Sequence, residues 1–191
     1  DLVMNPEHRD LFIRKSKFWK LIRSFLGEHN FIEVETPVLE LVTGGADAKP
    51  FITHHHALDQ DFYLRISTEL FQKRLIGGGF EKLFTLAPNF RNEGMDATHN
   101  PEFTSIEFYQ AYSDYKEMMM HTETLIDLVR QKLNLNNVID YQGMKIDLTV
   151  PFKKIGYDQS IIEIGNVDSN VLSSNLNSVN SGISTLKIGR A

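Results

Sequence analysis

Cysteine is absent from this chain of 191 residues, and tryptophan occurs once. The lack of cysteine excludes disulfides, thiolate nucleophiles and thiolate metal sites, and it suits a reducing compartment, so we expect a cytoplasmic protein. Long apolar runs are missing too: none approaches the ~20 residues of a membrane span, so we expect no membrane partner. The formal net charge of −5 excludes an overall positive field, so any contact with nucleic acid would need a local basic patch.

What is present is a mixture of helical and strand patterns. The pair Asn5-Pro6 predicts a helix start, and the apolar stripe that follows ends near Gly27 or Asn30. The patterns do not alternate as βαβ units, so we predict an α+β fold with a mainly antiparallel sheet flanked by helices. The other expected elements are a strand at 31–39, a strand at 61–66, a helix at 67–76 begun by Ser67 or Thr68, strands at 81–93 and 102–112, a helix from Asp114 to about Leu133 with Met118, Thr122, Leu125 and Val129 on one face, and a strand at 144–152.

Two of these strands are expected to pair as a hairpin with two unlike faces, because side chains alternate along a strand. The even positions are mostly apolar and would pack on a core. The odd positions gather polar groups onto the other face, namely Arg91, Glu93, Phe103, Ser105, Glu107 and Tyr109. A solvated sheet face gives the same alternation, so the pattern alone does not separate a binding surface from a wet one.

The residue types on that face favour a binding surface. The guanidinium of Arg91 offers a planar fork of donors that suits a phosphate or a carboxylate. Glu107 and Tyr109 can accept from an ammonium group. Phe103 offers a flat ring to a base, and Glu93 can accept from an exocyclic amine. An aminoacyl-adenylate combines all of these ligand groups.

The segment "FRNEG" at 90–94, followed by "HNPEFTSIEFYQAY" at 99–112, resembles the second motif of class II aminoacyl-tRNA synthetases in its lysyl form. "FIEVETPVL" at 31–39 resembles their first motif, which carries a proline and lies at a dimer interface. "TGGADAKPFITHHHALDQDFYLRISTEL" at 43–70 resembles the lysyl amino-acid-binding segment. The resemblance covers residues 6 to about 162, and the three blocks together are far more specific than a single glycine motif.

The resemblance implies an ATP site built on the second motif. Arg91 would bind the α-phosphate of ATP and the lysine carboxylate, and would stabilise charge during the in-line attack. Glu93 would accept from the adenine 6-amino group, and Phe103 would stack on adenine. His99 and Asn100 would lie in the loop that contacts the phosphates and adenine.

The resemblance also implies a lysine site. Glu69 and the backbone of Gly45 would hold the α-ammonium of lysine. Glu107 and Tyr109 would face its amino groups, with Tyr109 at the ε-ammonium end, and Arg91 would hold its carboxylate. That carboxylate attacks phosphorus directly, so the chemistry needs no protein nucleophile.

Each of these roles has a plainer structural alternative. Arg91 could form a structural salt bridge, and Glu107 a cross-strand ion pair. Glu69 could simply favour the start of a helix through the helix dipole. Gly44 and Gly45 could serve only a turn.

Three adjacent histidines at 54–56 invite a metal site. Neighbouring side chains of a strand point to opposite faces, so only His54 and His56 could converge. Two such ligands without an acid or a thiolate nearby are weak grounds for zinc. We therefore expect no metal site, and we assign the histidines a structural role or a place at the rim of the substrate site.

The chain also departs from the family pattern. Ala87 and Pro88 are atypical before "NF", and nothing after Phe152 resembles the third motif, a glycine-rich strand and helix with an arginine. We therefore expect residues 1–163 to form a partial synthetase catalytic domain that yields little adenylate alone, with the Mg²⁺ ligands outside it. Residues 164–191, of which eleven are Ser or Asn, would belong to an insertion between the second and third motifs, where apolar spacing favours an irregular helix over disorder.

The resemblance implies a lysine–tRNA ligase with ATP, lysine and tRNA(Lys) as substrates, Mg²⁺ as cofactor, and a homodimer formed through the first motif. Two alternatives stay open: a lysyl-synthetase-like paralogue that attaches lysine to a protein, and a non-catalytic module that dimerises. Gly94 favours the tRNA ligase, because the paralogues usually carry a second acid there.

Overall fold

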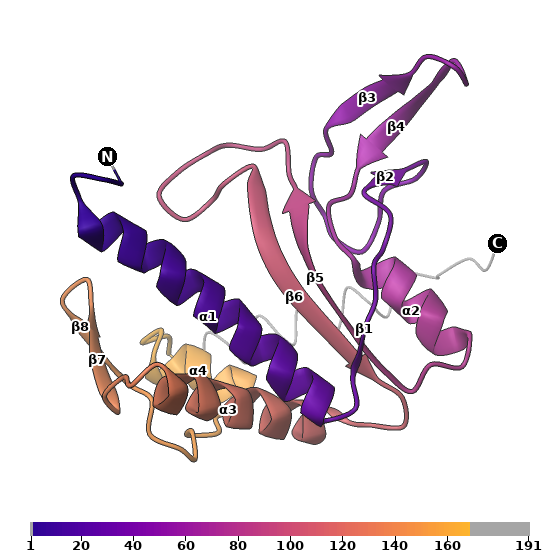
Figure 1. Ribbon diagram of the computed structural model, residues 1–191. Coiled ribbons are helices and arrows are strands. Elements are labelled where there is room, and N and C mark those ends of the chain that lie inside the picture. Colours follow the sequence, from indigo (N-terminus) through magenta and orange to yellow (C-terminus); the bar gives the residue numbers. More distant parts are fainter. Residues whose placement is uncertain (1, 169–191) are drawn as a thin grey trace. The chain divides into compact units, whose positions relative to one another are not determined.

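The computed structural model describes residues 2–168, which form an α+β structure with mainly antiparallel strands, as predicted (Figure 1). The chain divides into two compact units, one up to Val150 and the other from Pro151 onward. The first unit holds every residue that the sequence assigns to a site.

A three-stranded sheet and the loop between its last two strands carry most of those residues, and the strand order is β1 (Ile32–Glu33), β5 (Lys82–Phe90), β6 (Glu102–Gln110). β5 and β6 pair antiparallel along their whole length, whereas β1 pairs parallel with β5. The predicted hairpin is therefore confirmed, but β5 ends at Phe90. Arg91 lies just beyond it, where its backbone N–H still donates to the carbonyl of Pro101 at 2.8 Å.

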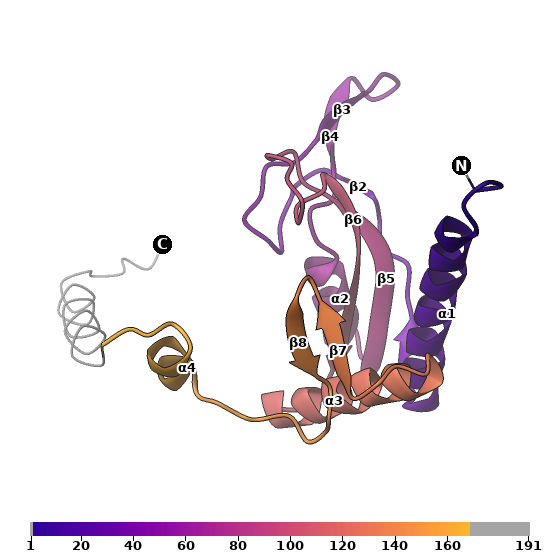
Figure 2. The same ribbon diagram turned by 90° about the vertical axis from the view of Figure 1, so that its left-hand side faces the viewer.

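The even face of the hairpin packs on two helices, as predicted from its apolar residues. α1 (Pro6–Glu28) and α3 (Tyr115–Lys132) cover this face, and α2 (Glu69–Gly77) contacts the opposite one (Figure 2). The buried core cluster joins helix and strand residues, namely Ile22, Phe25, Leu26, Phe31, Phe84, Leu125 and Val129, with Ile106 and Phe108 packed against it. The odd face is buried along β5, where Leu83 and Ala87 are core residues, so the polar side chains of the odd positions gather on β6.

Asp114 begins α3 as predicted, since its side chain accepts from the backbone N–H groups of Lys116 and Glu117 at 2.9 and 3.1 Å. The predicted buried face of this helix is wrong by one position in its first half. Thr122 is exposed and donates its hydroxyl to the carbonyl of Met118, while His121 is buried with Leu125 and Val129. A histidine was not counted as apolar, so the pattern alone missed it.

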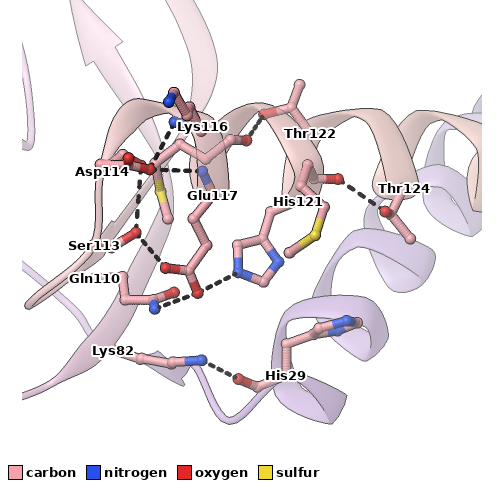
Figure 3. Close-up of polar contacts among 12 residues, drawn as sticks. His29, Lys82, Gln110, Ser113, Asp114, Lys116, Glu117, His121, Thr122 and Thr124 are labelled. Carbon is pink, nitrogen blue, oxygen red and sulfur yellow. Dashed lines mark hydrogen bonds and ion pairs between the residues drawn. The ribbon is translucent and has the colours of Figure 1, made fainter. Parts of the chain in front are cut away.

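His121 sits in a polar network between α1, α3 and the lower end of the hairpin (Figure 3). Its ring lies 5.4 Å from that of His29, and its Nε2 lies 3.9 Å from Glu117 Oε1. Glu117 accepts in turn from Gln110 at 2.8 Å, and Lys82 donates to the carbonyl of His29. Burial lowers the pKa of His121, and electrostatic interaction with His29 and Lys82 lowers it further. The neutral imidazole is therefore the form that this site stabilises.

The segment 31–39 is not one strand, which corrects the prediction. It contributes β1 and then β2 (Leu39–Glu40), which belong to different sheets. Pro37 has no backbone N–H and cannot donate to a strand ladder. The buried guanidinium of Arg65 instead donates to the backbone carbonyls of this segment, to Thr36 O at 2.8 Å and to Pro37 O at 3.4 Å. The same guanidinium donates to Pro88 O at 2.8 Å. Arg65 thus ties this turn to the strand that leads to Arg91.

A second sheet has the order β2, β4 (Gln60–Leu64), β3 (Ile52–His55) and is antiparallel. The predicted strand at 61–66 corresponds to β4, and the helix predicted at 67–76 is α2. Thr68 occupies the position before α2, but it is the hydroxyl of Ser67 that accepts from the N–H of Glu69, at 3.1 Å.

The strand expected at 144–152 is present only as β8 (Met144–Asp147), which pairs with β7 (Val138–Tyr141) in a hairpin that the sequence patterns did not predict. The second unit contains α4 (Tyr157–Glu163), where Lys153 pairs with Glu163 at 3.0 Å. The irregular helix expected at 164–191 lies mostly outside the described residues. No helix among residues 2–168 is both long and apolar enough to cross a membrane.

Candidate functional site

A cavity of about 280 Å³ opens beside the loop that joins β5 to β6. Its lining consists of Arg91, Glu93, Gly94, Thr98, His99, Asn100 and Phe103. All five residues expected at an ATP site are therefore brought together around one space, although they are spread over 13 positions of the sequence. A nucleotide base with its phosphates needs this mixture of a ring, a cation, an acid and an amide.

Arg91 lies across the ring of Phe103, with 5.1 Å between the guanidinium carbon and the ring centroid. Within residues 2–168 no carboxylate lies at ion-pair distance from Arg91, and its buried Nε has no hydrogen-bond partner there. A buried donor without an acceptor costs free energy. The surroundings of Arg91 thus suit an arginine that binds an oxyanion of a ligand better than an arginine that forms a structural salt bridge.

Glu93 is held by the loop that contains the paired glycines. The backbone N–H of Lys49 donates to Glu93 Oε1 at 3.2 Å, and the carbonyl of Lys49 accepts from the N–H of Asn92 at 2.7 Å. The two segments that resemble the amino-acid-binding and second motifs are joined directly at this point. Lys49 was not among the expected site residues, since backbone contacts leave no mark on side-chain patterns.

The loop at the mouth of the cavity is organised by Asp96, which sequence reasoning also missed. Its carboxylate accepts from the backbone N–H of Thr98 at 2.7 Å and of His99 at 2.9 Å, and the ring Nδ1 of His99 lies 2.8 Å from its other oxygen. These hydrogen bonds, with the one from Thr98 N–H strongest, hold the pKa of Asp96 well below its usual range. The spacing Asp-x-Thr is typical of an Asx turn and would have allowed the prediction.

Glu107 occupies the centre of the expected lysine site. Its Oε1 accepts from the hydroxyl of Ser67 at 3.3 Å, and its Oε2 accepts from the phenol of Tyr109 at 3.1 Å. Burial raises the pKa of Tyr109, and the charges of Glu107 and Glu69 raise it further. The phenol therefore stays protonated and donates a hydrogen bond to Glu107. Glu107 is thus bound by hydroxyl groups, whereas its structural alternative was a cross-strand ion pair.

Gly45 passes directly over Ser67 and Glu69. Its φ is +84°, and a Cβ at this position would lie 2.9 Å from Ser67 Oγ and 3.0 Å from Glu69 Cβ. Only glycine tolerates both the backbone conformation and the contact, so the residue does more than complete a turn. Glu69 forms an ion pair with Lys73 one turn along α2, and this ion pair uses part of the hydrogen-bonding capacity of the Glu69 carboxylate.

The histidines of the β3–β4 hairpin form a separate local cluster. His54 and His56 share a face as expected, with 5.2 Å between ring centroids. Contrary to expectation, acids do lie nearby: Asp61 is 2.9 Å and Asp59 is 3.4 Å from the ring nitrogens of His54. Even so, no group of three or more His, Asp or Glu side chains in the described part of the chain is arranged to hold a metal ion.

The sequence profile of the family described as "tRNA synthetases class II (D, K and N)" matches residues 1–183. The chain belongs to this family of class II synthetases. The motifs at 31–39, 43–70 and 90–112 are thus those of a class II synthetase.

Similar proteins named lysine–tRNA ligase carry comparable sequences. One from Thermoanaerobacter sp. (strain X514) is 54% identical over 170 residues, which is 89% of this class II synthetase chain and 34% of the relative. Those of Clostridium perfringens (strain SM101 / Type A) and Clostridium botulinum (strain Langeland / NCTC 10281 / Type F) are 49% and 48% identical, over 91% and 92% of the chain and 35% of each relative. The chain spans about a third of the length of these curated relatives.

Proposed function

We propose that the protein carrying this chain is a lysine–tRNA ligase, which activates lysine with ATP to lysyl-adenylate and transfers the lysyl group to tRNA(Lys). One observation carries the proposal: the residues expected to bind ATP surround one cavity at the end of the hairpin, and the residues expected to bind lysine meet on the odd face of the same hairpin. The similarity to proteins named lysine–tRNA ligase supports the choice of amino acid.

The proposed ATP site consists of Arg91, Glu93, His99, Asn100 and Phe103. Phe103 presents its ring to adenine, and Glu93 presents a carboxylate to the exocyclic amine. Asp96 holds His99 in place, so the loop over the nucleotide is ordered before ATP arrives.

The proposed lysine site consists of Gly45, Glu69, Arg91, Glu107 and Tyr109. Glu107 accepts from Tyr109 and still has lone pairs for an ammonium group. Gly45 leaves its backbone close to Glu69, so that together they can hold the α-ammonium. In this arrangement the carboxylate of lysine turns toward Arg91.

The proposed reaction is one in-line substitution. A carboxylate oxygen of lysine forms a bond to the α-phosphorus of ATP, the bond from that phosphorus to the bridging oxygen breaks, and pyrophosphate leaves with the electron pair. Arg91 is a cation whose planar fork can contact the α-phosphate and the lysine carboxylate together, and it stabilises the charge of the transition state. Positioning and electrostatics supply the catalysis.

Class II synthetases use Mg²⁺ with ATP, but the acids described here do not fit a metal held by the protein. In residues 2–168 no His, Asp and Glu side chains gather in the number that a metal site needs. Glu93 and Glu107 accept from Lys49 and from Ser67 and Tyr109, and the proposal assigns their remaining lone pairs to adenine and to lysine. No step of the proposed chemistry is therefore derived through the metal.

We further propose a cytoplasmic homodimer formed through residues 31–39. Ile32, Val38 and Leu39 are exposed apolar side chains of this segment, with exposed fractions of 53%, 39% and 45%, and burial against a second copy would remove them from water. The chain contains no cysteine, which suits a reducing compartment.

ATP–pyrophosphate exchange by the whole protein tests the proposal. Exchange should depend on lysine, and neither aspartate nor asparagine should replace it, although both are substrates of the wider family. Exchange driven by aspartate or asparagine would reject the assignment to lysine. Transfer of lysine to a protein instead of tRNA would favour the paralogue.

A further inference from the structure

Ser67 lies in the chain between β4 and α2, with only 6% of its surface exposed. Its hydroxyl oxygen accepts from the backbone N–H of Glu69 at 3.1 Å and donates to Glu107 Oε1 at 3.3 Å. A serine hydroxyl has one proton and two lone pairs, so both hydrogen bonds can exist together. One small side chain thus links the start of α2 to a strand of the other sheet.

The hydroxyl completes a two-sided hold on Glu107. One carboxylate oxygen is held by Ser67, and the other by Tyr109 at 3.1 Å. Rotation about the last bond of the glutamate side chain would break both hydrogen bonds. Each oxygen keeps a second lone pair, so the carboxylate is oriented without being saturated.

Gly45 closes the arrangement from above. A Cβ there would lie 2.9 Å from Ser67 Oγ, so the backbone of this loop passes directly over the hydroxyl. Glu69 and Glu107 each form a hydrogen bond with Ser67, and Tyr109 forms one with Glu107. Apart from Arg91, every residue expected to contact lysine therefore contacts Ser67 or a direct partner of Ser67. The sequence patterns gave Ser67 only a place at the start of a helix.

We propose that Ser67 is a positioning residue of the lysine site, whose hydroxyl orients Glu107 and the first turn of α2 toward the amino groups of lysine. This inference rests on the proposed lysine–tRNA ligase activity. Ser67 acts through Glu107 and does not touch the reacting atoms.

Ser67→Ala in the whole protein tests the inference by lysine-dependent ATP–pyrophosphate exchange. The KM for lysine should rise about tenfold, as expected for a lost hydrogen bond to a charged group, while the KM for ATP stays unchanged. Thr68→Val is the matched control, because the hydroxyl of Thr68 accepts from the side chain of Gln72 in α2, at 2.9 Å. That variant should keep the KM for lysine.

A double-mutant comparison separates positioning from a general loss of structure. If Ser67 acts through Glu107, Ser67→Ala should have little further effect on the KM for lysine in a Glu107→Gln background. Equal losses in both backgrounds would overturn the inference. So would a fall in melting temperature accompanied by parallel changes in the KM values for lysine and ATP.

Ser67→Cys covers the case in which alanine destabilises the site. It keeps the volume but donates only weakly, so the KM for lysine should lie between those of the parent and the alanine variant. Parent protein without lysine-dependent exchange would refute the proposed function itself. Parent exchange with an unchanged KM in both Ser67 variants would refute the role of Ser67 alone.

Discussion

The guanidinium of Arg91 lies over the ring of Phe103, 5.1 Å from its centroid, at the mouth of the cavity in the first unit. The two residues belong to different sides of the loop between β5 and β6, so their contact closes the loop at its base. A cation held over a ring is attracted to its π-face. The contact therefore helps to hold the guanidinium of Arg91 at the cavity.

Replacing Arg91 with lysine keeps the charge and removes the planar fork, so it should abolish most adenylate formation. The loss of a contact made in the transition state should cost roughly 3–4 kcal/mol, or about 10²–10³ in rate. ATP–pyrophosphate exchange measures the rate, and thermal unfolding serves as the check on the fold. Normal exchange with a lowered melting temperature would show a structural salt bridge instead.

Phe103→Leu should raise the KM for ATP several-fold and raise the KM for lysine by less, because Arg91 rests on this ring. Leucine is apolar, but it removes the ring that stacks on a base and that supports Arg91, an interaction of about 0.5–2 kcal/mol. Phe103→Tyr keeps the ring and should behave like the parent. Equal KM values for ATP in the leucine and tyrosine variants would contradict the stacking role.

Glu107→Gln should chiefly raise the KM for lysine, because it removes a negative charge and preserves the shape of the side chain. Ser67 and Tyr109 donate to different oxygens of Glu107, so only one of the two hydroxyls keeps its acceptor in the glutamine variant. Steady-state exchange at varied lysine and at varied ATP separates the two KM values. A purely structural acid would instead lower the melting temperature and leave both KM values alone.

Gly45→Ala should impair lysine binding and destabilise the fold by about 1–2 kcal/mol, since the added Cβ meets Ser67 and Glu69 at a positive φ. Gly27→Ala provides the contrast. Gly27 lies within α1 and has open space around the added atom, so alanine there should stabilise the helix by about 0.5–1 kcal/mol. Chemical denaturation measures both, and destabilisation of equal size would refute the close approach.

Stability should fall as the pH drops below about 6.5, the pKa of a histidine in an unfolded chain. His121 has a lowered pKa in the fold, so the unfolded chain binds the proton more readily and protonation favours unfolding. Its contribution is fully present above that pH and is lost toward the lower pKa of the folded state.

His121→Leu should flatten this dependence in denaturation experiments between about pH 5 and 8. His8→Gln, at an exposed position near the start of α1, should keep the slope of the parent. The account would be wrong if the His121 variant kept the full slope, or if stability rose on acidification.

The alternation of residue types predicted the hairpin, although β5 is buried on both faces, and the family motif supplied the roles proposed for Arg91 and Glu107. The break of residues 31–39 into β1 and β2 was not predictable from alternation, since it depends on Arg65, which is distant in sequence and satisfies the carbonyls at Pro37. Lys49 contributes through its backbone only.

His121 and Ser67 were missed for a related reason. Each is a polar residue whose burial depends on neighbours from other elements, His29 in one case and Glu107 in the other. Patterns within one element report its exposed and buried faces, but they do not say which polar side chains meet across elements.

Nine consecutive residue pairs join β5 to β6, from Lys82 with Gln110 to Phe90 with Glu102. Phe84, Ile106 and Phe108 face the core cluster from one side of this ladder, and Glu107 and Tyr109 lie on the other, so the insertion or deletion of a single residue in either strand would exchange the two sides beyond it. Phe84 and Glu107, where they lie beyond the change, would then each point to the opposite face of the sheet. A change of length within either strand should therefore disrupt the proposed lysine site, whereas a change in the loop between the strands would leave the pairing of β5 and β6 intact.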